Sequence, residues 1–137
     1  MPNHDHAAVV AREWIAKADN DLKNATHTLK LGADCPTDTV CFHAQQGVEK
    51  YLKAFLVALE VAFPKTHDIE TLVGLMPKHA RVSLTIEQQR RLTDYATVMR
   101  YPGPYKPVTL SEAKDAVRLA RRVRREILKS LEDKPLF

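Results

Sequence analysis

The chain is poor in the residue types and patterns that mark several classes of protein. Among its 137 residues only Cys35 and Cys41 are cysteines, and their spacing matches no zinc or redox motif. No apolar run approaches the roughly 20 residues needed to cross a bilayer, and the N-terminus carries no apolar signal segment. We therefore expect a cytoplasmic protein with reduced thiols and no membrane partner. His4 and His6 form only a weak metal-binding pattern in a solvated tail, so we expect no metal and no cofactor.

The bulk composition is ordinary for a single folded domain. Hydrophobic residues make up 45% of the chain and charged residues 28%. We expect one domain over residues 1–137, with a core over about 8–131 and loose ends. The formal net charge of +4 permits an acidic partner or nucleic acid without requiring either.

Apolar residues recur every three or four positions in five segments, and no segment alternates with a period of two. The pattern predicts an all-α fold with helices over 8–31, 36–62, 67–76, 85–98 and 110–131. Long helices with short connections pack as antiparallel neighbours. We therefore predict an up-and-down four-helix bundle with a short extra helix. Apolar surface left over around Trp14 suits a homodimer.

Several residues predict where these helices begin and end. Gly32 and Pro64 are expected to end the first two helices, and Thr66 is expected to cap the third. The segments 85–88 and 109–112 match the capping-box pattern at the start of the last two helices. Ile86 is expected in the core. Gly47, inside the second helix, predicts that another backbone passes close by.

Residues 43–53 are the stretch with the clearest functional pattern. At about 100° per residue the apolar side chains fall on one side of the predicted helix. The other side carries His43, Gln46, Lys50 and Lys53. This polar face is suited to a polyanionic ligand, although a solvated surface with a structural histidine explains the same pattern.

A proline-rich connection, residues 100–107, follows the fourth helix. Its three prolines exclude a helix and make the segment stiff. Arg100, Tyr101 and Tyr105 lie in it and are candidates for phosphate contact. In the simpler interpretation Arg100 pairs with Glu49 or caps a helix, and the tyrosines pack the loop.

Several sequence blocks, in this order, resemble the HEPN domain. They are Trp14, Ala18 and Asp21-Leu22; His43-Ala44-Gln45-Gln46; Glu49-Lys50 and Leu52-Lys53; Pro64 to Asp68; and Arg100-Tyr101-Pro102-Gly103. The resemblance spans about residues 10–130. It implies a helical bundle, usually a homodimer, often encoded beside a minimal nucleotidyltransferase as a toxin–antitoxin pair. Many members of the family are metal-independent ribonucleases, and others only bind RNA or nucleotides.

The chain departs from the active pattern of that family, in which an arginine is followed after four to six residues by a histidine. Arg100 matches the arginine, but the partner positions hold Tyr105, Lys106 and Pro107. If the chain is a nuclease, His43 is the candidate substitute, because histidine exchanges a proton near neutral pH.

Three functional hypotheses follow from these patterns. The favoured one is a nucleotide- or RNA-binding module of a HEPN/nucleotidyltransferase pair. The alternative is a ribonuclease toxin using Arg100 and His43. The third is a purely structural dimerisation domain. Without the histidine the binding module is ahead, with Arg100, Tyr101, Tyr105, Gln46, Lys50 and Lys53 as its expected surface.

Overall fold

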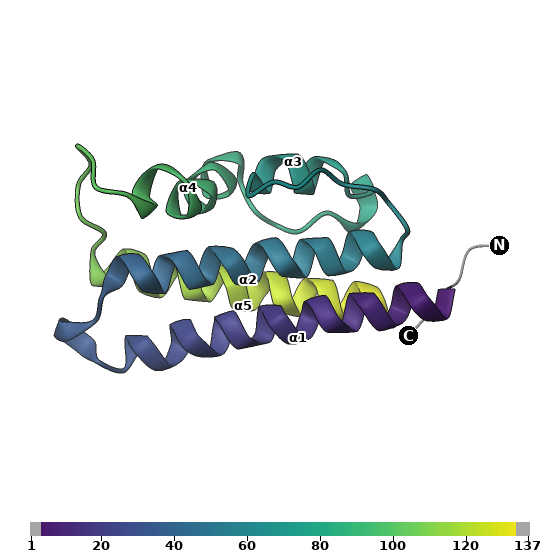
Figure 1. The fold of residues 1–137 in the computed structure, drawn as a ribbon, viewed down its shortest axis with the longest axis horizontal. Helices are drawn as coiled ribbons and strands as arrows, with labels where there is room; N and C mark the ends of the chain where they lie inside the picture. Colours follow the sequence, from purple (N-terminus) through teal and green to yellow (C-terminus); the bar gives the residue numbers. More distant parts are fainter. Residues whose placement is uncertain (1–3, 134–137) are drawn as a thin grey trace.

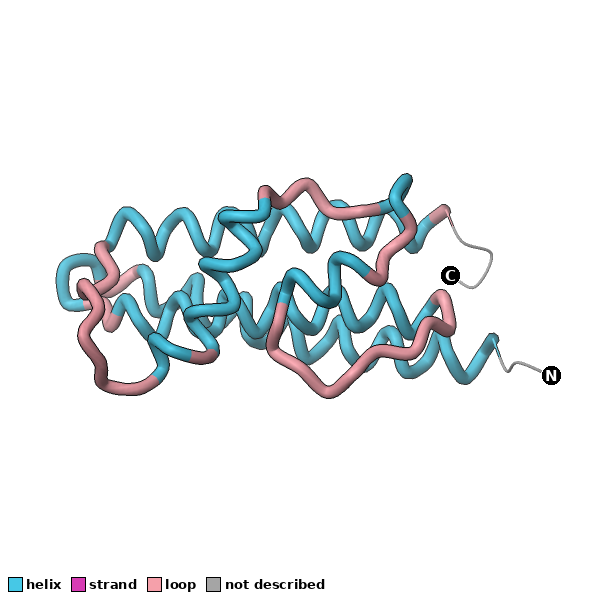
Figure 2. The backbone as a smooth tube through the Cα atoms, turned by 90° about the horizontal axis from the view of Figure 1, so that it is seen from above, coloured by secondary structure: helices cyan, strands magenta, loops and turns pink. Residues whose placement is uncertain are grey.

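The computed structural model describes residues 4–133, and this part of the chain is built from helices and turns without a strand (Figure 2). The helices are α1 (His4–Leu29), α2 (Thr37–Ala58), α3 (Ile69–Gly74), α4 (Ile86–Ala96) and α5 (Leu110–Glu132). Three 3₁₀ turns join them: η1 (Gly32–Asp34), η2 (Lys78–Ala80) and η3 (Val98–Arg100). The predicted all-α bundle of four helices with a short extra helix is confirmed.

The helix α2 lies at the centre of the bundle. It packs against α1, α5 and α4, and α3 covers its C-terminal half (Figure 1). The chain runs along α1, returns along α2, comes back through α3 and α4, and returns again along α5 (Figure 1). The connection 101–109 therefore lies at the end of the bundle where α2 and α5 begin.

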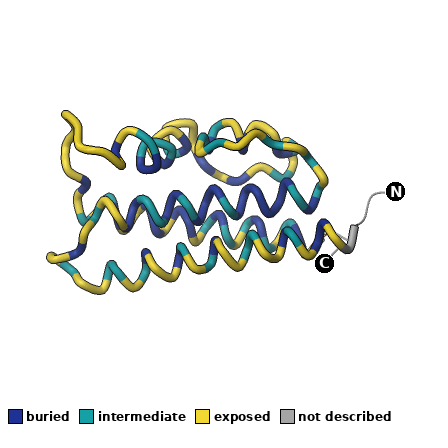
Figure 3. The backbone as a smooth tube through the Cα atoms, in the orientation of Figure 1, coloured by how far each residue is buried: buried dark blue, intermediate teal, exposed yellow. Residues whose placement is uncertain are grey.

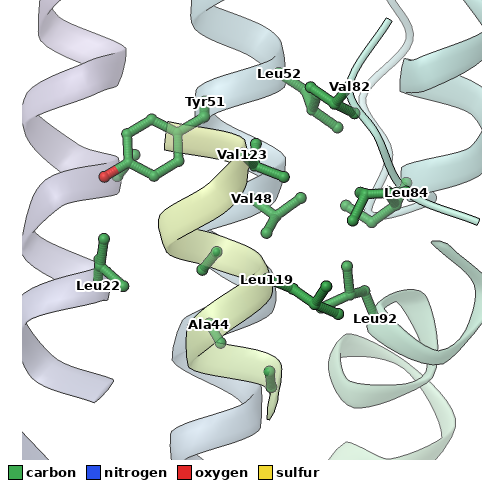
Figure 4. Packing of buried hydrophobic residues seen from close by; sticks show 14 of the residues in the cluster. Leu22, Ala44, Val48, Tyr51, Leu52, Val82, Leu84, Leu92, Leu119 and Val123 are labelled. Atoms are coloured by element: carbon green, nitrogen blue, oxygen red, sulfur yellow. The ribbon is translucent and has the colours of Figure 1, made fainter. Parts of the chain in front are cut away.

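The core is formed by the apolar faces of these helices around α2, most of which is buried (Figure 3). Val48, Leu52 and Leu92 belong to it, and the close view shows Leu52 beside Val82 and Leu92 beside Leu119 (Figure 4). The expected stripe of α5 is buried along its whole length, from Ala113 to Leu131. At Gly47 an added Cβ would lie 3.5 Å from the carbonyl oxygen of Ala18, so the predicted close approach of another backbone is confirmed, and that backbone is α1.

The ends of the first two helices differ from the sequence prediction. The helix α1 spans His4–Leu29 instead of 8–31, and α2 stops at Ala58, before the expected end at 62. Glu60 takes a positive φ of 57°, which is unusual for a residue with a side chain. The amide of Val61 then donates to the carbonyl of Leu56 and that of Glu60 to Val57. This Schellman arrangement ends α2 without the glycine that normally signals it.

The predicted helix starts are borne out in part. Thr85 and Gln88 form the complete capping box of α4. Thr109 caps α5, but the side chain of Glu112 bonds to Arg91 and Tyr95 instead of closing the box.

Two expectations about individual side chains were wrong. The cap of α3 is Asp68, which accepts from Thr71, and Thr66 accepts from the Asp68 amide outside the helix. Ile86, expected in the core, is 49% exposed. Gln89 takes the inward position in the first turns of α4, because its amide donates to the carbonyl of Leu84.

Candidate functional site

The polar face of α2 is organised around two carboxylates, and the first is Asp21 of α1. Its Oδ1 lies 3.0 Å from Nδ1 of His43, and its Oδ2 lies 2.6 Å from Nζ of Lys50. The Asp21 side chain is only 13% exposed, and the two partners are about a quarter exposed. His43 and Lys50 therefore lie together, as the sequence pattern predicted, but one acidic residue offsets their positive charge.

The second carboxylate is Glu49, which is buried. It accepts from Nε2 of Gln45 at 3.0 Å, from Nζ of Lys53 at 2.9 Å and from Nδ1 of His67 at 2.8 Å. The Lys53 side chain is 8% exposed and lies beside the rings of Trp14 and Phe63. Lys53 was expected on the exposed cationic face, and the structure instead buries it in an ion pair.

The amide of Gln46 points to this second cluster as well, donating to Oε1 of Gln45 at 2.7 Å. His67 contributes to it from the loop that follows α2, a contact that the sequence did not predict. The residues expected on one face thus divide into two groups, with His43 and Lys50 at Asp21 and Gln46 and Lys53 at Glu49.

Arg100 ends η3 and meets the N-terminal part of α2 at Phe42. Its guanidinium carbon lies 4.2 Å from the centroid of the Phe42 ring. Within residues 4–133 no carboxylate pairs with it, in contrast to Lys50 and Lys53. The expected alternative, a pair between Arg100 and Glu49, is absent from this part of the chain.

Phe42 connects Arg100 to the polar face of α2. Its ring packs edge-on against the imidazole of His43, with centroids 5.6 Å apart. A depression of about 210 Å³ adjoins Arg100 and is lined also by Asp38, Thr39 and Tyr95. Phe42, which the sequence did not single out, thus contacts both Arg100 and His43.

The proline-rich loop after Arg100 is exposed over residues 101–107 and is braced from within. The hydroxyl of Tyr105 donates to the carbonyls of Met99 at 3.1 Å and Tyr101 at 2.5 Å. Its ring also lies against Gly103, where an added Cβ would come within 3.3 Å of it. Tyr101 is 66% exposed, so its ring remains open to a ligand while Tyr105 holds the loop.

Near Arg100, the buried Tyr95 and Cys41 lie close to an ion pair that is only partly buried. The Tyr95 hydroxyl donates to Glu112, which also pairs with Arg91 at 2.7 Å. Burial is the larger cause of the raised pKa of Tyr95, and the hydrogen bond to Glu112 is the second. Burial likewise raises the pKa of the Cys41 thiol to about 12. Neither group ionises near neutral pH, so neither serves as a nucleophile or base there.

Asp21 and Phe42 belong to this site but were not predicted as parts of it. Asp21 was noted only within the family resemblance, and nothing in a single sequence indicates that it faces α2. Phe42 sits one position before His43, and its stacking under Arg100 depends on where the turn η3 ends. Both contacts join segments far apart in the chain, which periodicity does not report.

Within residues 4–133 no three histidine, cysteine or acidic side chains are grouped to hold a metal ion. Over the same residues no helix is long and apolar enough to cross a membrane.

Comparisons with known proteins agree with the fold. The crystal structure of TT1696 from Thermus thermophilus is similar, with a TM-score of 0.71 and 30% sequence identity. The similar region covers 87% of this chain and 96% of that chain. Among curated proteins none matches. The family model of the HEPN domain matches residues 11–131, nearly the whole described chain, and the protein therefore belongs to the HEPN domain family.

Proposed function

We propose that this protein is a phosphate-binding helical module for a nucleotide or RNA, with its binding site centred on Arg100. One observation carries the proposal. Among the cationic residues of the predicted surface, Arg100 alone is exposed and has no carboxylate partner within residues 4–133. An exposed guanidinium held in place keeps its N–H fork available for the oxygens of a phosphate.

The aromatic contact supports this assignment. A guanidinium stacked on a ring gains attraction to the ring face and loses fewer rotamers when it binds. Phe42 holds Arg100 at 4.2 Å in this way. The exposed Tyr101 ring offers a stacking surface for a base beside it.

The other residues of the expected surface contribute to the proposed site to different degrees. His43 and Lys50 lie on the adjoining stretch of α2 and reach a ligand only in competition with Asp21. Gln46 and Lys53 stabilise the helix through the Glu49 cluster, and Tyr105 braces the loop. Because Asp21 and Glu49 offset the cationic groups of α2, we expect Arg100 to govern the affinity of this site for a mononucleotide. Its salt dependence should be shallow, with a slope no steeper than about −1.

We further propose that the module acts within a pair of the toxin–antitoxin type, as a homodimer with a minimal nucleotidyltransferase partner. Membership of the HEPN family supports this proposal. A shallow apolar depression of about 430 Å³ around Trp14 on α1, beside the exposed Val9, offers a surface for a second copy. Sedimentation of the purified protein tests the dimer, and co-purification with the product of a neighbouring nucleotidyltransferase gene tests the pair.

A second candidate function is favoured by the pairing of His43 with Asp21. With Nδ1 donating to the carboxylate, a neutral imidazole has its lone pair on Nε2 and can accept the proton of a ribose 2′-hydroxyl. The 2′-oxygen then attacks phosphorus and forms a 2′,3′-cyclic phosphate, while Arg100 stabilises the added charge. The bond to the 5′-oxygen breaks, and that oxygen takes the proton held at Nε2 of His43. This describes a metal-independent ribonuclease without the usual histidine after the arginine.

One set of measurements tests both functions. Binding of a ligand at about 100 times its Kd raises stability by about 2.7 kcal/mol, which a melting experiment detects easily. We expect a mononucleotide to raise the melting temperature of the wild-type protein and not that of Arg100→Ala. Cleavage of RNA in the presence of a chelator, lost in both Arg100→Ala and His43→Ala, selects the ribonuclease. No melting shift with any nucleotide or RNA contradicts the binding module.

A further inference from the structure

A second cationic surface lies between α1 and α5, whose helices run side by side in the bundle (Figure 1). A groove of about 410 Å³ is lined there by residues between Asp19 and His27 of α1 and by Arg121, Arg124 and Arg125 of α5. None of these residues belongs to the Arg100 site. We call this surface the α1/α5 groove.

The α1/α5 groove holds most of the net charge of the protein. Its lining contains four cationic side chains, those of Lys23, Arg121, Arg124 and Arg125, and one carboxylate, that of Asp19. The lining therefore carries a formal charge of +3, compared with +4 for the whole chain. A concave surface of one charge concentrates the field and attracts anions.

The single carboxylate in the groove is already engaged. Asp19 Oδ1 accepts from the Tyr51 hydroxyl at 2.5 Å and from Nε of Arg124 at 2.9 Å. Figure 4 shows the Tyr51 hydroxyl directed from α2 towards α1. Burial and the bond to Asp19 raise the pKa of Tyr51, so the phenol stays a donor. This arrangement also explains why Arg124 projects from the apolar side of α5.

The other cations of the groove are available to a ligand. Lys23 and Arg125 have no carboxylate partner among residues 4–133, and Arg121 donates only to the hydroxyl of Thr26 at 3.2 Å. Two arginines and a lysine thus face one groove without an anion to neutralise them. By contrast, Arg118 on the same helix pairs with Asp115, three residues before it.

The spacing of these groups matches a chain of phosphates. Lys23 and His27 are four residues apart on α1, and Arg121 and Arg125 are four residues apart on α5, which places each pair about 6 Å apart along its helix. Successive phosphates of a nucleic-acid strand are separated by a similar distance. The lining contains no Phe, Tyr or Trp side chain, so apart from the imidazole of His27 it offers a base little surface for stacking.

We propose that the α1/α5 groove binds the phosphodiester backbone of a single-stranded nucleic acid, without base preference. Arg121 and Arg125 contact phosphates from α5, and Lys23 contacts them from α1. Arg124 keeps its ion pair with Asp19 and contributes only through its positive charge. Arginine suits this role because its planar fork meets two phosphate oxygens at once. This groove does not include Arg100. A bound strand would contact the groove and the Arg100 site through different nucleotides.

The test is the salt dependence of binding to a fluorescent oligouridine, measured by anisotropy in about 50–200 mM salt. On a single strand each phosphate contact adds about 0.7 to the slope of log K against log salt. The double variant Arg121→Gln/Arg125→Gln should therefore lower the slope by about 1.4 and weaken binding about 25-fold in 0.1 M salt. Lys23→Gln should lower the slope by about 0.7 from the opposite wall of the groove.

The matched control is Lys114→Gln/Lys129→Gln, which removes the same charge from exposed positions of α5 outside the groove. Its affinity should stay within about twofold of the wild type, since it breaks no phosphate contact. Equal weakening in both double variants would overturn the proposal, because it would show that binding depends only on the net charge of the protein. So would binding lost in Arg100→Ala but unchanged in both groove variants, a result that leaves the Arg100 proposal standing.

Three further arms decide the nature of the ligand. Oligothymidine should bind like oligouridine, because the groove reads phosphates, and binding of RNA alone contradicts this. Poly-glutamate that competes more strongly than oligouridine would assign the groove to an acidic protein segment and overturn the proposal. A change in oligomeric state of the Arg121→Gln/Arg125→Gln variant would assign it to a second copy of the chain and overturn it equally.

Discussion

Replacing Lys53 by methionine should destabilise the protein strongly while leaving ligand binding unchanged. The ion pair of Lys53 with Glu49 is buried, with side chains 8% and 5% exposed, so its loss leaves an uncompensated carboxylate in the core. Breaking one side of such a pair costs about 3–5 kcal/mol. Gln45 and His67 still donate to Glu49, which places the expected loss near 3 kcal/mol. For a chain of this size the melting temperature should fall by about 10 °C.

Urea denaturation followed by circular dichroism measures this loss directly. In the double variant Glu49→Leu/Lys53→Met most of the stability should return, because the buried charge is gone and Gln45 still donates to the carbonyl of His67. The control is Arg118→Met, whose pair with Asp115 is exposed and should be worth less than about 0.5 kcal/mol. The reasoning would be refuted if Lys53→Met lost less than about 1 kcal/mol in the free energy of unfolding, or if the double variant were less stable than Lys53→Met.

Three more expectations follow from the same contacts. With its pKa raised to about 12 by burial, Cys41 should react with a thiol reagent at pH 8 only as fast as the protein unfolds, and rapid reaction in the folded state would contradict its burial. Tyr51 and Tyr95 have raised pKa values in the folded state, so these phenols ionise first in the unfolded chain and stability should fall above about pH 10. Each Tyr→Phe variant should therefore unfold at a higher alkaline pH than the wild type, as measured by ultraviolet absorbance. Asp21→Asn frees His43 and one lysine, so it should strengthen RNA binding and steepen its salt slope by about 0.7, but a ribonuclease using the Asp21–His43 pair should instead lose cleavage.

The fold was within reach of the sequence because its information is local. Periodic apolar residues located all five helices, and Thr85 with Gln88 located the start of α4. The errors lie where a boundary depends on the backbone or on distant partners. Glu60 ends α2 in a conformation usually left to glycine, and Glu112 turns to Arg91 on another helix instead of closing its own cap.

The candidate site was predictable only in part, because its residues belong to segments distant in the chain. The order of residues on α2 placed His43 and Lys50 on one side, and their proximity follows from helix geometry. The same geometry placed Lys53 with them, since periodicity does not report that α3 and its preceding loop cover that end of α2. The carboxylates that decide which cations are free, Asp21 above all, came only with the tertiary structure.

The measurement that most directly tests the account is the melting shift of Arg100→Lys and Arg100→Ala with a short RNA, beside the wild-type protein. We expect a clear shift in the wild type and a reduced one in Arg100→Lys, which keeps the charge but loses the fork and the stacking on Phe42. The smallest shift is expected in Arg100→Ala, where only the α1/α5 groove still holds the RNA. Both variants should melt near the wild-type temperature without RNA, because Arg100 is exposed. A full shift in Arg100→Ala, at the same RNA concentration, would contradict the claim that this guanidinium forms the phosphate site.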